Sequence, residues 1–252
     1  MNRKILELKR IARGNLTFKY KVPMLAVLFS YLASVVINTP FSDNYLTNPT
    51  LSSNIIFLLA SLLSGLLLSI IMYGQIYIHL KLARLGDPKM GDIFVFFKNQ
   101  PDRYLLGSLL MLLIVVCSAL PFYLLAFLSN ILFYESYTLN FAVNIILMIC
   151  SVLACLLACV KLTMFPFFLV DRTDLSITEC FLLSNKKSHG QLGRLIKIHL
   201  SFLGFYLLSV LSMGIGFVWV LPYVTQTFTV LYLDIIGELS SLEYQKMKPS
   251  EN

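Results

Sequence analysis

The residue types that carry most protein chemistry are sparse in this chain and do not fall into catalytic or metal-binding spacings. The histidines His79, His189 and His199 are scattered, and no H-E-x-x-H or Cys/His ligand pattern includes them. Cys155 and Cys159 share a helix face by their spacing, but no histidine or carboxylate lies near them in sequence. We interpret these cysteines as packing residues. The sequence therefore predicts no catalytic residues, no metal site and no cofactor.

Polar side chains within apolar runs are the remaining place where chemistry could be concentrated. A lysine at the centre of a bilayer costs about 2.5–3.5 kcal/mol, so such a residue points to a function or to a partner. Two interpretations are open. Either these residues line an inward-facing polar cavity, or they form interhelical hydrogen bonds and an aromatic belt while the lysine stem reaches the inner boundary. The candidate cavity residues are Lys161, Tyr223, Gln226, Gln75 and Tyr73.

The elements that carry these residues are predicted to be membrane-spanning helices. The 252 residues are 58% hydrophobic and 13% charged, whereas about 25% of the residues in a soluble domain are charged. A helix needs about 20 apolar residues to cross the hydrocarbon. Six runs approach that length, and Pro121 is expected to kink or break the third. We predict one all-α membrane domain over residues 1–252, a bundle with spans at about 22–37, 54–78, 104–129, 141–165, 198–211 and 217–236.

The distribution of positive charge predicts how these helices are threaded. The chain has 20 lysines and arginines, and the loops 38–53, 130–140 and 212–216 contain none of them. Because basic residues are enriched on the cytoplasmic side of membrane proteins, both termini are predicted to be cytoplasmic. A five-helix alternative would place Lys246 and Lys248 outside, which favours six. The net charge of +7 is interpreted as this same bias, with an affinity for anionic lipid and no role in nucleic-acid binding.

A short amphipathic segment precedes each pair of predicted spans. These segments cover about residues 5–15, 91–98 and 176–190, and the third begins with Ser176 and Glu179 in an S-x-x-E capping box. Their apolar faces have two possible partners. The segments lie flat on anionic headgroups, or they cap the helix bundle from the cytoplasmic side.

Rows of small residues at helical spacing predict close helix packing, because small side chains let helix backbones approach each other in lipid. The rows favour packing of the second span on the fourth. The alternative is an interface with a second copy or with a membrane-protein partner. They comprise Ser61, Gly65 and Ser69 in the second span and Ser151, Cys155 and Cys159 in the fourth.

Several stretches of the chain resemble one bacterial membrane family. They are FPFFLVD (165–171), SITECFLLSNKKSHG (176–190), LSFLG (200–204) and GIGFVWVLPY (214–223), together with LYLD (231–234). They resemble the family called domain of unknown function 975, and the N-terminal Glu7 to Asn15 matches the opening of that family. One departure is Phe205, where the family pattern has Trp. The resemblance implies a plasma-membrane protein of the Gram-positive type, and it brings no established activity.

These observations favour a non-enzymatic integral membrane protein of the bacterial cell membrane. Such a protein acts through lipid or protein contacts, as an accessory, envelope-maintenance or immunity-type protein. The alternative function is a small-molecule or peptide transporter or channel, which would need the candidate cavity residues to line a pathway. A membrane enzyme is the least favoured class, because the sequence has no catalytic pattern.

Overall fold

The structure is a computed structural model that describes residues 3–47 and 50–247, and this part of the chain is helical without strands. Lys248, used above in the charge argument, lies outside the described residues. The helices are α1 (Ile5–Leu16), α2 (Lys21–Thr47), α3 (Leu51–Ala83), η1 (Met90–Phe94), α4 (Val95–Lys98), α5 (Pro101–Leu132), α6 (Tyr137–Leu162), α7 (Phe165–Asp171), α8 (Ile177–Ser188), α9 (Leu192–Ser201), α10 (Leu203–Leu211), α11 (Phe217–Ile236) and α12 (Leu239–Met247).

Within the described residues, six helical runs are long and apolar enough to cross a membrane, as predicted. They are Lys21–Ser42, Leu51–Ala83, Pro101–Leu132, Tyr137–Asp171, Leu192–Leu211 and Phe217–Ile236. The chain is thus an all-α multi-pass membrane protein.

The structure shows how two of these spans are built. Of the kink or break predicted at Pro121, the break does not occur: α5 continues through this residue, because a membrane helix tolerates the loss of the one hydrogen bond that a proline removes. The helical run that contains the predicted fifth span begins at Leu192. It consists of α9 and α10, which meet at Phe202, where the buried ring packs edge-on against Tyr223 at 5.2 Å between ring centroids.

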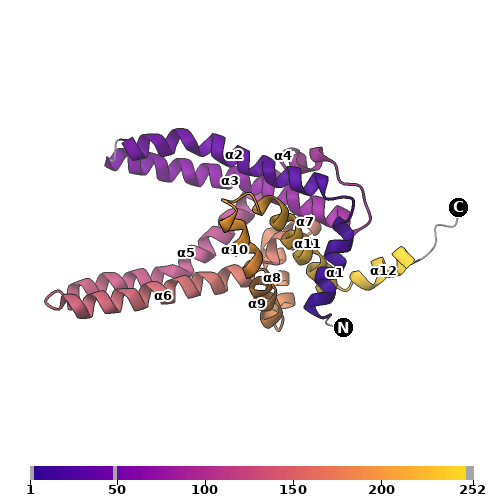
Figure 1. The fold of residues 1–252 in the computed structure, drawn as a ribbon. Coiled ribbons are helices and arrows are strands. Elements are labelled where there is room, and N and C mark those ends of the chain that lie inside the picture. The colour runs from indigo at the N-terminus through magenta and orange to yellow at the C-terminus, as the bar shows by residue number, and fades with distance from the viewer. Residues whose placement is uncertain (1–2, 48–49, 248–252) are drawn as a thin grey trace.

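The helices form two long hairpins that diverge from a common base (Figure 1). The α2–α3 hairpin and the α5–α6 hairpin both extend to the left of the figure, whereas α1 and α12 lie at the right. We call the base the hub; it comprises α1, α7, α8, α9, α11 and the adjoining ends of α3 and α5. The largest buried side chains lie in it, among them Tyr73, Tyr104, Phe165, Phe168 and Tyr232.

The outer parts of the hairpins expose their apolar side chains instead. Leu58 on α3 and Phe127 on α5 are exposed by 66% and 65%. Large apolar patches are rare on the surface of a soluble monomer, whereas lipid is a good solvent for them. The structure therefore divides the protein into a packed hub and two hairpins with lipid-type surfaces.

Two glycines allow the connecting segments to pack closely on the spans. A side chain at Gly74 would collide with the backbone of Ile93 in η1, and one at Gly107 would meet Leu169 of α7. Because glycine has no Cβ, η1 can lie directly on α3, and α7 on α5. These contacts close the hub.

The connecting segments place some of their apolar residues in the hub. In α1, Leu8 and Ala12 are buried in the main core. The predicted capping box at α8 is confirmed: the Glu179 N–H donates to Ser176 Oγ at 3.3 Å, and the Ser176 N–H donates to the Glu179 carboxylate at 2.7 Å. Part of each apolar face thus contacts the bundle, whereas Leu6 of α1 and Leu182 of α8 are exposed.

The predicted packing of the second span on the fourth is wrong, because both small-residue rows contact α5. Ser108 of α5 donates a hydrogen bond to Ser69 at 2.7 Å, and Ser118 of α5 lies 3.7 Å from the Cys155 sulfur. Gly65, in the middle of the first row, is exposed, and a Cβ added there would have no other atom within 4 Å. Helix α5 thus separates the two rows.

Candidate functional site

The five candidate cavity residues lie in different environments, and no hydrogen bond joins any two of them in the described part of the chain. Tyr73 is buried between α3 and α5, where its ring lies 5.1 Å from that of Tyr104. Gln75 points toward α2 and donates from Nε2 to Ser30 Oγ at 2.5 Å. Both side chains therefore act as links between neighbouring spans in this structure.

Gln226 is fully buried on α11 and faces α3. Its Oε1 lies 2.6 Å from Nδ1 of the buried His79, and its Nε2 has no hydrogen-bond partner among the described residues. An unpaired amide donor in a buried position costs about 1–3 kcal/mol. His79 and Gln226 are 2% and 0% exposed, so this polar contact between two spans is deeply buried.

Lys161 and Tyr223 lie apart from this pair. Lys161 is exposed on α6 and lines a groove next to Phe181 and Asn185 of α8. Tyr223 is half-buried on α11 and faces α1, with the Arg13 guanidinium 5.8 Å from its ring centroid.

Ion pairs between sequence-distant residues connect the helices of the hub, and no pattern in the sequence predicted them. Arg84, just beyond α3, contacts the Asp171 carboxylate at 2.5 and 3.1 Å and the Glu238 carboxylate at 2.7 Å. Tyr232 donates to Asp171 at 2.7 Å. The hydrogen bonds to Glu238 and Asp171 raise the pKa of Arg84, so the guanidinium stays charged. This cluster joins α3, α7, α11 and the start of α12.

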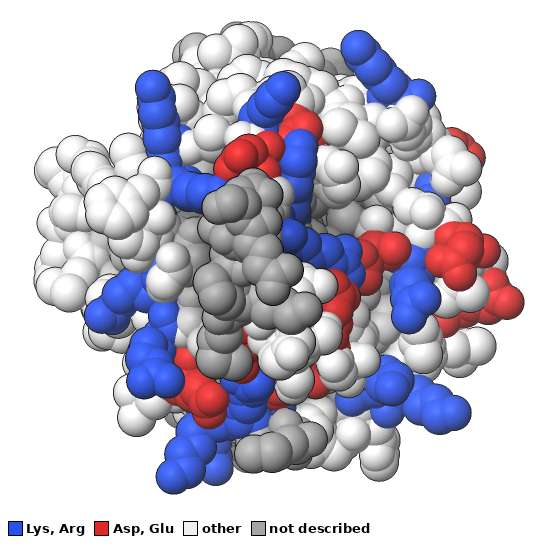
Figure 2. All heavy atoms as spheres, turned by 90° about the vertical axis from the view of Figure 1, so that its right-hand side faces the viewer, with Lys and Arg blue, Asp and Glu red and all other residues white. Residues whose placement is uncertain are grey.

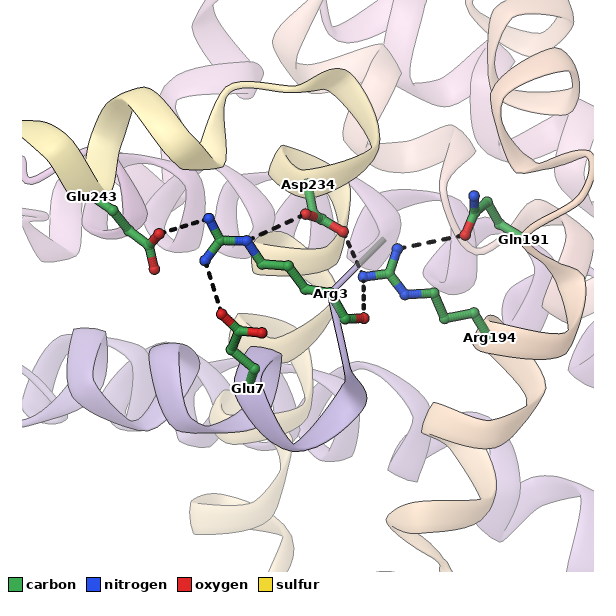
Figure 3. Close-up of polar contacts among 6 residues, drawn as sticks. All are labelled: Arg3, Glu7, Gln191, Arg194, Asp234 and Glu243. Atoms are coloured by element: carbon green, nitrogen blue, oxygen red, sulfur yellow. Dashed lines mark hydrogen bonds and ion pairs between the residues drawn. The ribbon is translucent and has the colours of Figure 1, made fainter. Parts of the chain in front are cut away.

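A second cluster surrounds Arg3 and Arg194 (Figure 3). Arg3 contacts Glu243 at 2.6 Å, Glu7 at 3.3 Å and Asp234 at 3.7 Å. Arg194 of α9 reaches the other oxygen of Asp234 at 2.5 Å and donates to the Arg3 carbonyl at 2.8 Å. The hydrogen bond to Glu243 outweighs burial and raises the pKa of Arg3. The cluster therefore ties the N-terminal segment to α9, α11 and α12.

A sequence signal for these clusters exists in retrospect. Asp171 and Asp234 each stand at the end of an apolar run, where an isolated carboxylate needs a counter-ion. The identity of that counter-ion could not be predicted, because Arg84 lies 87 residues from Asp171 and Arg194 lies 40 from Asp234.

The basic face of α1 borders a groove of about 500 Å³, which we call the α1 groove. Lys9 is half-buried there: its Nζ donates to the Ser201 carbonyl at 3.0 Å and lies 3.8 Å above the Phe202 ring. Burial lowers the pKa of Lys9, and the nearby Arg13 lowers it further. The lining comprises Lys4, Leu6, Glu7, Lys9, Arg10, Arg13 and Tyr223.

The α1 groove thus contains four cations and one carboxylate, and Glu7 is already paired with Arg3. The N-terminal end of α1 borders a second groove of about 450 Å³, whose basic residues are Arg3, Lys4, Arg194 and Lys197. Lysine and arginine side chains ring the end of the molecule that carries α1 and α12 (Figure 2). This arrangement can bind phosphate or carboxylate groups at several points.

Comparison with known protein families matches residues 1–238 to the family described as "Protein of unknown function (DUF975)". Searches of the curated proteins and of the solved structures gave no match. The match extends from the N-terminal segment through α11, so it includes the α1 groove and the Arg84 cluster. The resemblance found in the sequence is confirmed, and this multi-pass membrane protein belongs to the DUF975 family.

Proposed function

We propose that the protein is a non-enzymatic protein of the bacterial cytoplasmic membrane that acts by binding anionic lipid headgroups on its hub, with both termini in the cytoplasm. A membrane-protein partner or a second copy would then use the apolar hairpins. The observation that carries this proposal is the α1 groove, where four cations face one paired carboxylate.

The way α1 is held favours this function. Leu8 and Ala12 attach the helix to the core, so its basic face is presented without a folding step. Leu6, in the lining, is 83% exposed, and Phe18, just beyond α1, is 102% exposed. Apolar side chains beside cations are typical of helices at the headgroup level. Each basic residue near an anionic surface contributes about 1 kcal/mol.

Native mass spectrometry of the full-length protein from nanodiscs tests the proposal. The triple variant Lys4→Gln, Arg10→Gln and Arg13→Gln should retain less phosphatidylglycerol than the wild type, and added salt should reduce retention in the wild type. The matched control removes three exposed cations that do not line the α1 groove: Lys89→Gln, Lys186→Gln and Lys187→Gln. Equal retention in both triple variants, or binding that ignores salt, would refute the proposal.

A transporter is the second candidate function, and the buried contact between His79 and Gln226 favours it. In a transport pathway, the unpaired Gln226 Nε2 would bind a passing polar group. A Gln226→Leu variant that inserts and folds normally but loses its cellular phenotype would support transport. If the double variant His79→Leu with Gln226→Leu keeps both stability and phenotype, the contact is structural, since a matched apolar pair leaves no group unsatisfied.

A further inference from the structure

A groove of about 340 Å³ lies between α5, α6 and α8, away from α1. We call it the Lys161 groove. Its floor includes Ala154 and Ala158 of α6, and Ser118 of α5 lies beside them. Phe181 and Asn185 of α8 and Lys161 of α6 also line it. The groove therefore combines small and apolar side chains with a few polar ones.

The charge in this groove is uncompensated. Its lining contains Lys161 and no carboxylate, and Lys161 makes no ion pair with any described residue. In the hub, by contrast, Arg84, Arg3 and Arg194 all contact carboxylates. A cation in a predominantly apolar groove is complementary to an anion that comes from outside the chain.

The apolar part of the groove has the dimensions for a hydrocarbon chain. Ala154 and Ala158 are one helical turn apart, and Lys161 follows three residues later. Along α6 this stretch covers about 10 Å at about 1.5 Å per residue. Because alanine side chains are small, they leave a shallow channel there. The larger side chain of the neighbouring Leu157, which is 52% exposed, borders this channel. The channel lies on spanning helices, where acyl chains are the surrounding solvent.

We infer that the Lys161 groove binds one anionic phospholipid, with its phosphate on Lys161 and Asn185 and one acyl chain along Ala154 and Ala158. This inference deepens the proposed function by adding a specific lipid site to the headgroup contacts of α1. The site has its own residues, so it can be tested separately from the α1 groove. The phospholipid comes from the bilayer around the protein.

Photo-crosslinking on the full-length protein in nanodiscs tests the site. The probe is phosphatidylglycerol with a photoreactive acyl chain, and mass spectrometry locates the adduct. We expect adducts on α5 and α6 near Ala154 and Ala158. Lys161→Met should weaken binding about tenfold, since it removes the charge-assisted hydrogen bond to the phosphate. Lys161→Arg should retain binding, and the matched control Lys98→Met, an exposed lysine outside the groove, should leave it unchanged.

A second variant separates a bound lipid from a lysine that merely reaches the headgroup layer. Ala158→Phe fills the channel and keeps the cation, so it should remove the adduct while circular dichroism remains that of the wild type. An adduct that persists in Ala158→Phe would overturn the inference. Equal labelling by photoreactive phosphatidylcholine would also overturn it, because that headgroup carries no net charge.

Two further measurements define the source of the anion and the relation to α1. Soluble glycerol phosphate should not displace the lipid; displacement at equal concentration would show a free-phosphate site and overturn the inference. The triple glutamine variant of α1 should leave the adduct at Ala158 unchanged. If that variant loses headgroup binding but keeps the adduct, both proposals hold. If Lys161→Met keeps the adduct, the inferred Lys161 site is refuted, and the proposal of headgroup binding at α1 is unaffected.

Discussion

Removal of the Arg84 guanidinium should destabilise the hub more than removal of any exposed cation. Arg84→Met leaves Asp171 and Glu238 without their shared counter-ion. The Asp171 side chain is only 10% exposed, so water cannot replace the lost contacts there. Glu238 is 29% exposed and is partly solvated. The larger part of the loss in folding stability is therefore expected to come from Asp171.

The magnitude follows from the burial of the three side chains. Removing one partner of a buried ion pair costs about 3–5 kcal/mol, and a hydrogen bond to a charged group contributes about 1.5–3 kcal/mol. Arg84 itself is 34% exposed, and solvent screens part of the interaction. We expect the free energy of unfolding to fall by about 2–3 kcal/mol. At about 2–4 °C per kcal/mol for a chain of this length, Tm should fall by about 4–12 °C.

Thermal unfolding of the purified protein in one detergent is the assay. Lys98→Met is the matched control, because Lys98 is exposed and its side chain forms no ion pair with a described residue. Adding Asp171→Asn and Glu238→Gln to Arg84→Met should recover part of the loss, since no unpaired charge remains in the cluster. A Tm for Arg84→Met within about 1 °C of wild type, or no recovery in the triple variant, would refute the reasoning.

Two further predictions concern packing and topology. Gly74→Ala should lower the free energy of unfolding by about 1–3 kcal/mol, because the added Cβ meets the backbone of Ile93. Gly65→Ala places its Cβ in open space and should raise the free energy of unfolding by about 0.5–1 kcal/mol. Equal effects of the two variants in thermal unfolding would contradict the tight α3–η1 contact. Reporter fusions in the loops at 43–50, 133–136 and 212–216 should be extracellular and those at 85–89 and 189–191 cytoplasmic, since all lysines and arginines avoid the first three loops; a single reproducible reversal would overturn the six-span topology.

The sequence alone determined the class of the protein, the number of spans and the family. Hydropathy and charge are local properties, so runs of apolar residues and their basic flanks can be recognised without knowledge of any contact. The capping box at Ser176 was predictable for the same reason, because both of its residues lie within one helical turn.

The tertiary structure alone decided which helices pack together and which polar groups meet. Lipid leaves every face of a spanning helix apolar, so the sequence periodicity that identifies a buried face in a soluble protein is weak here. For this reason the sequence did not predict that both small-residue rows contact α5, or that the five candidate cavity residues lie in separate places. The ion pairs depend on residues far apart in sequence: Arg84 and Glu238 are 154 positions apart, and Arg3 and Glu243 are the N-terminal and C-terminal partners of another pair. Only the closure of the hub brings such charges within bonding distance, because the contact is a property of the packed helices and of no local segment.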